Sequence, residues 1–189
     1  MAKKHGGFTL IELVVVIVII AILTTIAVVS YSGIQRRAAA TQLLTAASEW
    51  KKALEVYKAK NGDLPITASP ICLGDTYPAA DGFPANSCQI QANGTSLYDV
   101  DSAFNTTIDS YIDTMPKTAS TTVQFADKYT GSVRGLLFSH PVGAVEAVIY
   151  YYLKGDQSCG SFYKSYSPNN SASPGGYTNC SVKIPIDAL

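Results

Sequence analysis

The strongest pattern in this chain is a long apolar segment close to its start. Residues 8–29 are apolar except for three threonines and Glu12, and no charged residue occurs in residues 13–35. A charge-free run of this length exceeds the roughly 20 residues that a helix needs to cross a bilayer. The pattern therefore predicts a helix that enters a membrane.

A second, one-sided pattern follows Gln35. Apolar residues recur there at steps of three and four, which is typical of an amphipathic helix; they are Leu43, Ala47, Trp50, Leu54 and Tyr57. Asn61-Gly62 is a natural helix end, and Pro65 follows it. We expect one continuous helix from Phe8 to about Lys60, with a domain packed over Trp50 and Tyr57.

The remaining residues predict a small antiparallel sheet. Residues 62–96 are rich in Pro, Gly and Asn and predict an irregular loop, and a short second helix should follow before Met115-Pro116. Strands are expected over residues 121–125, 133–139, 144–154 and 177–186. The fold class is α+β: a long N-terminal helix packed against three or four antiparallel strands.

These patterns divide the chain into successive parts. We expect a short basic segment over 1–7, a hydrophobic transmembrane helix over 8–35, an amphipathic helix over 36–61 and a globular head over 62–189. Within the head, residues 62–120 form a loop with a short helix, and residues 121–189 form the antiparallel sheet.

The apolar segment allows two ordinary interpretations. A cleaved signal peptide has an apolar core of about 7–15 residues and a small-residue cleavage site, and Ala38-Ala39-Ala40 resembles such a site. The run is too long for that, however, and Arg36-Arg37 separates it from the alanines. A plain membrane anchor accounts for the length but leaves Glu12 unexplained, because an unpaired carboxylate inside an apolar segment is costly.

A third interpretation accounts for the carboxylate. The sequence Gly7-Phe8-Thr9-Leu10-Ile11-Glu12-Leu13, after a short basic start, closely resembles the processing site of type IV prepilins and pseudopilins. The resemblance covers roughly residues 3–65. It implies that residues 1–7 are a prepilin leader, which a prepilin peptidase removes by cleavage between Gly7 and Phe8, and that Phe8 becomes the N-methylated first residue. It also implies that residues 8–35 are the assembly helix and that Glu12 is its acidic assembly residue. Many type IV pilins also carry a glycine and a proline where this chain has Ala21 and Val29, so the usual helix breakers are missing here.

The chemistry of this motif can be argued from the residues alone. Cleavage before Phe8 creates an ammonium group at the edge of an apolar helix. In a staggered bundle, that ammonium can approach Glu12 of a neighbouring chain, and two costly charges become one hydrogen-bonded ion pair. This predicts a homopolymer formed through the N-terminal helices, which would depend on a pilus assembly machinery.

The four cysteines, Cys72, Cys88, Cys159 and Cys180, all follow the apolar segment. Four cysteines on one side of a membrane segment indicate two disulfides in an oxidising compartment. Three pairings are possible, and we favour Cys72–Cys88 and Cys159–Cys180 because each closes a loop rich in Gly, Pro, Ser and Asn. The alternative is a set of free buried thiols. Disulfides place the C-terminal part outside and the N-terminus in the cytoplasm.

Charge and candidate chemistry narrow the class of protein. The formal net charge is zero, so the basic surface that direct nucleic-acid binding needs is missing. From Arg36 to Lys60 six basic residues accompany two acidic ones, whereas from Asn61 onward six accompany eleven, an imbalance that suits contacts between subunits. No phosphate-binding glycine loop is present, and a hydrolase triad would rest on His140 alone. We expect no enzyme activity and no cofactor.

Some side chains leave other possibilities open. Four aspartates could hold calcium but lack a complete loop pattern, and helix capping or a solvated surface is the preferred interpretation; they are Asp99, Asp101, Asp109 and Asp113. Tyr150 and Tyr152 should lie on one face of a strand and Tyr151 on the other. One set should pack on the helix, and the other could form an exposed contact surface.

Together these features predict a structural subunit of a type IV pilus. It would be a single-pass protein of the cytoplasmic membrane before assembly and part of an extracellular filament afterwards, serving adhesion, twitching motility or DNA uptake. The alternatives are a pseudopilin of a type II secretion or competence apparatus, and a membrane-anchored domain that never polymerises. Only the last predicts an uncut N-terminus.

Overall fold

The computed structural model of the protein describes residues 9–74, 77–91, 94–112, 114, 116, 122–125, 131–168 and 175–186. The chain divides into two compact units, Met1–Arg37 and Ala38–Leu189. The first consists, in its described part, of helix only. The second contains the rest of that helix, a short helix and two antiparallel sheets, so the expected α+β, pilin-like fold is confirmed.

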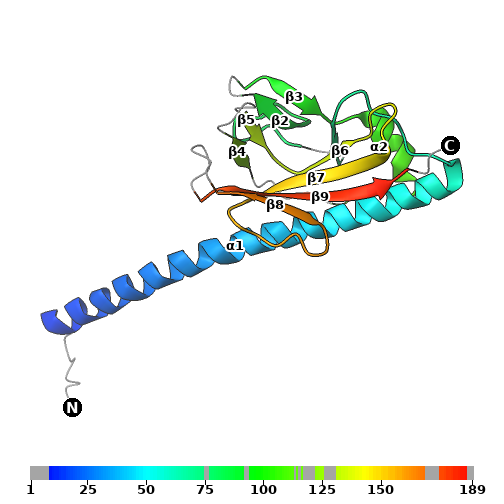
Figure 1. Cartoon of the computed structure of the whole chain (residues 1–189). Coiled ribbons are helices and arrows are strands. Elements are labelled where there is room, and N and C mark those ends of the chain that lie inside the picture. The colour runs from blue at the N-terminus through cyan, green and yellow to red at the C-terminus, as the bar shows by residue number, and fades with distance from the viewer. Residues whose placement is uncertain are drawn as a thin grey trace, which may run out of the picture. The chain divides into compact units, whose positions relative to one another are not determined.

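Figure 1 shows the order of the elements along the chain. They are α1 (Leu10–Asn61), β1 (Ile71–Leu73), β2 (Ser87–Gln91), β3 (Ser96–Asp99), α2 (Ser102–Asp109), β4 (Val123–Phe125), β5 (Gly131–Val133), β6 (Leu136–Ser139), β7 (Glu146–Lys154), β8 (Tyr163–Ser167) and β9 (Tyr177–Pro185).

Helix α1 ends where the sequence predicts. The backbone N–H of Gly62 donates to the carbonyl of Lys58 at 2.8 Å. Gly62 has a φ of 87°, a left-handed conformation that a glycine adopts without strain and that commonly ends a helix. The side-chain amide of Asn61 donates to the carbonyl of Tyr57 at 2.9 Å and satisfies another carbonyl of the last turn.

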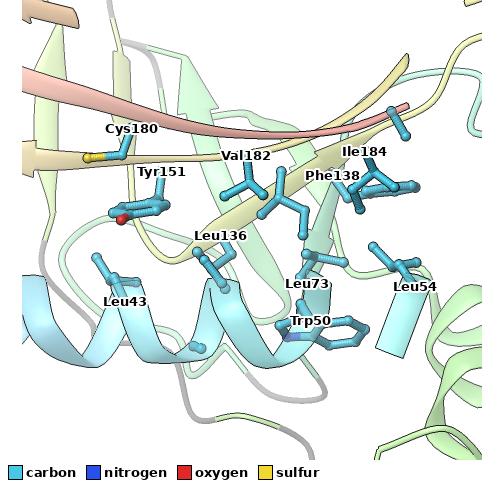
Figure 2. Packing of buried hydrophobic residues seen from close by; sticks show 14 of the residues in the cluster. Leu43, Trp50, Leu54, Leu73, Leu136, Phe138, Tyr151, Cys180, Val182 and Ile184 are labelled. Carbon is cyan, nitrogen blue, oxygen red and sulfur yellow. The ribbon is translucent and has the colours of Figure 1, made fainter. Parts of the chain in front are cut away.

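The larger sheet packs one face on the second half of α1. Its strand order is β1-β6-β7-β9-β8, and all neighbours are antiparallel. Burial alternates along β7 and along most of β9, so every second side chain points into the core. Figure 2 shows Leu43 and Leu54 of α1 directed toward Tyr151, Val182 and Ile184 of the sheet. Trp50 is fully buried in this cluster and Tyr57 is half-buried against it, which agrees with the expected packing.

A second sheet, with the order β3-β2-β5-β4, provides a separate small core. This core also includes residues of the larger sheet, such as Leu137, together with half-buried tyrosines. Arg134, which follows β5, is buried, and its Nε and Nη2 groups donate to the carbonyl of Ser87 at 3.0 and 2.9 Å. Its guanidinium also lies 4.3 Å from the centre of the Phe83 ring. Arg134 thereby joins the end of β5 to the loop before β2.

Several sequence predictions are wrong in detail. The irregular loop expected over 62–96 contains β1, β2 and the start of β3, and β8 lies between the strands expected over 144–154 and 177–186, where no strand was predicted. These strands are three to five residues long. Their stabilising partners are distant in the chain, and so short a run carries no visible period of two. The expected strand over 133–139 is two strands, because Arg134-Gly135 separates them and Gly135 has a φ of 70°.

The short second helix is confirmed, but it does not begin directly after the loop expected over 62–96. Leu97 belongs to β3, and α2 starts at Ser102. Asp101 has an extended backbone, and its carboxylate accepts from the backbone N–H of Phe104 at 3.0 Å. This N-cap stabilises the start of the helix at that position. Thr121, expected to begin a strand, lies outside the described residues.

The three consecutive tyrosines of β7 alternate as expected. Tyr151 points toward α1 and is fully buried, whereas Tyr150 and Tyr152 are half-buried against the second core. The Tyr150 and Tyr152 rings meet edge to face, with centroids 6.1 Å apart, and Tyr152 meets Tyr177 at 5.8 Å. Tyr150 and Tyr152 therefore pack mainly within the molecule. They do not form the exposed contact surface that the sequence left open for them.

The Tyr151 hydroxyl provides a test of this core. It accepts and donates no hydrogen bond among the described residues, and burial raises the pKa of Tyr151 to about 12. An unpaired buried hydroxyl lowers stability, so Tyr151→Phe should raise the free energy of unfolding by about 1 kcal/mol at neutral pH. Denaturant titration in detergent micelles measures this change.

The same variant should also change the pH dependence. The unfolded tyrosine has a pKa of about 10. Below that pH Tyr151 is protonated in both states, so its raised folded pKa costs the wild type no stability. Above it, stability is lost as the pH rises toward 12, the folded value. Tyr151→Phe removes this alkaline loss, whereas Tyr163→Phe, at an exposed position, should leave it unchanged. Equal free energies of unfolding for Tyr151→Phe and the wild type, both at neutral pH and near pH 12, would contradict the interpretation that the Tyr151 hydroxyl is buried and unpaired.

Candidate functional site

The candidate site lies at the first turn of α1, where Thr9 and Glu12 bind one another. The backbone N–H of Thr9 donates to Glu12 Oε2 at 2.8 Å, and the Thr9 hydroxyl donates to the same oxygen at 2.6 Å. In return, the backbone N–H of Glu12 donates to Thr9 Oγ1 at 3.4 Å. This reciprocal arrangement is a capping box, which satisfies free N–H groups at a helix start. A carboxylate at this end also interacts favourably with the helix dipole.

Thr9 is a residue that the sequence analysis did not assign to the site. The signal for it was present, because Thr-x-x-Glu immediately before an apolar run is the sequence pattern of a capping box. The predicted cleavage residues Gly7 and Phe8 lie outside the described residues. Glu12 is described and exposed, and its second oxygen, Oε1, accepts no hydrogen bond from any described residue. That oxygen is therefore open to a donor from another molecule.

The rest of the first unit presents an apolar surface. Its large apolar residues with described side chains, from Leu10 to Ile34, are each between 43% and 81% exposed. The hydroxyls of Thr24 and Thr25 donate to the carbonyls of Ile20 and Ala21, at 2.9 and 2.5 Å. These threonines therefore add no unpaired hydroxyl donor to the surface. An apolar surface of this extent is a feature of contact with lipid or with another protein.

Both favoured disulfides are present in the second unit. Cys72–Cys88 links β1 to β2 with a Cα–Cα distance of 5.7 Å, and Cys159–Cys180 links the loop before β8 to β9 at 5.5 Å. All four sulfurs are inaccessible or nearly so. The first bond belongs to the small core between the sheets and the second to the core under α1. Cys72–Cys88 therefore ties two strands of different sheets together, and Cys159–Cys180 ties a loop segment to the central strand β9.

The other candidate side chains have structural roles. His140 is buried; its backbone N–H donates to Thr67 Oγ1 at 2.9 Å, and its Nδ1 lies 3.1 Å from the carbonyl oxygen of Pro65. Asp101 caps α2, and Asp99 Oδ1 accepts from the Ser96 hydroxyl. Within the described ranges, no three metal-ligating side chains of the His, Cys, Asp or Glu type form a cluster. Asp113 lies outside those ranges.

Comparison with known proteins agrees with the N-terminal geometry. The family model of the prokaryotic N-terminal methylation motif matches residues 2–28. This motif is the hallmark of the precursors of type IV pilins and pseudopilins, and the chain carries it at its N-terminus. It carries the motif that marks a substrate of prepilin peptidase in a pilus-like assembly system. No curated protein matches the chain, and no solved structure does.

No helix in the described part of the chain combines the length and apolarity required of a membrane span. The membrane crossing expected of residues 8–35 stays a prediction from the sequence and the motif.

The capping box can be tested with two substitutions at one position. Thr9→Val keeps the shape of the side chain but removes the hydroxyl, whereas Thr9→Ser keeps the hydroxyl. Loss of an N-cap costs about 1 kcal/mol, so the amides of residues 10–13 should exchange hydrogen about fivefold faster in Thr9→Val. Hydrogen-exchange mass spectrometry in detergent micelles measures this rate. Thr9→Ser should resemble the wild type, and unchanged protection in Thr9→Val would show that the cap contributes nothing.

Proposed function

We propose that this protein is a structural subunit of a type IV pilus. Residues 8–35 hold the precursor in the cytoplasmic membrane, cleavage between Gly7 and Phe8 removes the leader, and the subunits then polymerise into an extracellular filament. The observation that carries the proposal is the methylation motif over residues 2–28, which includes the first part of α1 with its exposed apolar side chains.

The geometry at Glu12 supports a role in assembly. Thr9 occupies only Oε2, so the carboxylate is held in place while Oε1 accepts nothing from the described residues. An N-methylated ammonium on Phe8 of a neighbouring chain could bind there without breaking the cap. Pairing the two charges lowers the cost of placing each of them in an apolar bundle. The apolar side chains of α1 would then exchange lipid for neighbouring helices.

The second unit suits exposure outside the cell. Its two disulfides fit an oxidising compartment, and the formal net charge of zero does not favour direct nucleic-acid binding. We propose a non-enzymatic role in which the filament performs adhesion, twitching motility or DNA uptake. Assembly and any movement would be driven by the ATPases of the pilus machinery.

Glu12 substitutions test the assembly step. Glu12→Ala and Glu12→Leu should leave membrane insertion and leader cleavage intact but strongly reduce the filament sheared from cells, because the Phe8 ammonium loses its partner. Glu49→Ala provides a matched control, since Glu49 is an exposed acid farther along the same helix. Shearing followed by immunoblotting of both fractions measures the ratio of filament protein to membrane-held subunit. Normal filament yield in both Glu12 variants would overturn the assigned role.

Mass spectrometry of the wild-type N-terminus tests the function as a whole. We expect protein sheared from intact cells to begin at N-methylated Phe8 and to carry both disulfides. The same cleavage found only in membranes would instead identify a pseudopilin of a secretion or competence apparatus. A chain that still begins at Met1 or Ala2 would identify a membrane-anchored domain that does not polymerise.

A further inference from the structure

The apolar surface of the first unit ends in a short segment of different chemistry. Tyr31 is the first aromatic residue after Phe8, and Arg36 and Arg37 carry the first charges after Glu12. The side chains of Tyr31, Arg36 and Arg37 are all exposed. The matched methylation motif ends at residue 28, before this segment. An aromatic ring and two guanidinium groups thus lie close together in the sequence, without a role in the motif.

The spacing along α1 matches the thickness of a bilayer. The helix is continuous through this region, and a rise of 1.5 Å per residue places Tyr31 about 28 Å beyond Glu12. The hydrocarbon core of a bilayer is about 30 Å thick. With Glu12 near the cytoplasmic interface, Tyr31 therefore lies at the outer interface. Arg36 lies about 8 Å farther along the helix, at the level of the lipid headgroups.

The side chains suit such an interface. A tyrosine ring has an apolar body and a polar hydroxyl, and tyrosines are enriched at the headgroup level. A guanidinium binds a phosphate through two parallel hydrogen bonds. Arg36 forms no hydrogen bond or ion pair in the described part of the chain, so its donors are available to an anion. Because lipid surrounds a membrane helix on every side, Tyr31 and Arg36 can reach headgroups from different faces of α1.

Orientation of the chain does not account for the two arginines. Basic residues that flank a membrane segment are enriched on its cytoplasmic side. Lys3 and Lys4 fit that tendency, whereas Arg36 and Arg37 lie on the other side under the proposed topology. Their charges oppose the proposed orientation. Binding of phosphate at the outer interface gives them a role that the tendency does not.

We propose that Tyr31, Arg36 and Arg37 form an interfacial anchor, which binds phosphate groups of phospholipids in the outer leaflet and fixes the depth of α1 in the membrane. The inference rests on the proposed function, because only a membrane-held precursor has an outer interface to bind. The charged groups oppose movement of α1 toward the cytoplasm. The apolar residues before Tyr31 oppose movement outward.

The depth of a single label tests the anchor. All four native cysteines are paired, so Gly33→Cys introduces one free thiol, at a position where an added Cβ meets nothing within 4 Å. The full-length chain is labelled there with a fluorescent maleimide and reconstituted into phosphatidylglycerol vesicles. Nitroxides attached either to the lipid headgroup or deep in the acyl chain quench the label according to its depth. We expect the headgroup nitroxide to quench more strongly.

Charge substitutions in the labelled chain should change this depth. Arg36→Gln/Arg37→Gln should lower the ratio of headgroup to acyl-chain quenching at least twofold, because the phosphate contacts are lost. Arg36→Lys/Arg37→Lys should retain most of the ratio, because an ammonium still binds phosphate. Lys52→Gln/Lys154→Gln is the matched control, since it removes two exposed positive charges from the second unit. An unchanged ratio in the arginine-to-glutamine variant, or an equal decrease in the control, would overturn the anchor.

The tyrosine is tested in the same assay. Tyr31→Trp keeps an amphipathic ring and should retain the ratio, whereas Tyr31→Leu should lower it, because leucine favours the hydrocarbon core. Equal ratios for both variants and for the labelled chain with Tyr31 would remove the tyrosine from the anchor.

The lipid composition of the vesicles tests the phosphate. Phosphatidylcholine, which carries phosphate without net charge, should support the same ratio as phosphatidylglycerol. Digalactosyldiacylglycerol, which forms bilayers without phosphate, should give the lower ratio of Arg36→Gln/Arg37→Gln. Equal ratios in all three lipids, or a decrease in phosphatidylcholine, would overturn phosphate binding. Recovery of the ratio in galactolipid vesicles on adding inorganic phosphate would identify a site for the free anion and overturn the lipid assignment.

Insertion itself separates this inference from the proposed function. Failure of the labelled chain to insert into vesicles of any of these lipids would overturn both the anchor and the membrane-held precursor. Insertion with a depth that is independent of the anchor residues would overturn the anchor alone.

Discussion

The burial of one face of α1 is the constraint on which the second unit depends. Between Leu43 and Leu54 the helix has apolar side chains at successive turns, and water would surround them without a covering layer. The alternating side chains of β7 and β9 meet this need, because every second residue of a strand points the same way. The order of the larger sheet follows from it: the two longest strands lie at the centre over the helix, and shorter ones flank them. The face of the larger sheet that points away from α1 is then covered by the second, smaller sheet.

The first unit has the opposite property. Its described large apolar side chains are exposed, which is a feature of surfaces that contact lipid or another protein. Glu12 adds a charge to that surface without leaving it unsatisfied, because Thr9 binds one carboxylate oxygen with two donors. Under the proposed function, the same side chain would serve both as a helix cap and as the assembly residue. The local hydrogen bonds fix its orientation, and the remaining oxygen is left for a partner.

Cys72–Cys88 and Arg134 hold the second sheet in place. The second sheet consists of strands of three to five residues, too short to be stable alone. Cys72–Cys88 anchors it to the larger sheet, and Arg134 holds the start of β2 through hydrogen bonds to the carbonyl of Ser87. A segment rich in Pro, Gly and Asn can therefore form ordered strands without a strong hydrophobic pattern of its own.

The sequence by itself determined the features that depend on neighbouring residues. The apolar run, the amphipathic face through Trp50, the helix end at Gly62 and the long strands all have a local period or a local cap, and the processing motif is contiguous. Even the Thr9–Glu12 cap could have been predicted, since its residues are three apart. Only the tertiary structure decided which short segments became strands and which face of the tyrosine triplet is buried. Those outcomes depend on partners far away in the chain, and a local pattern carries no information about such partners.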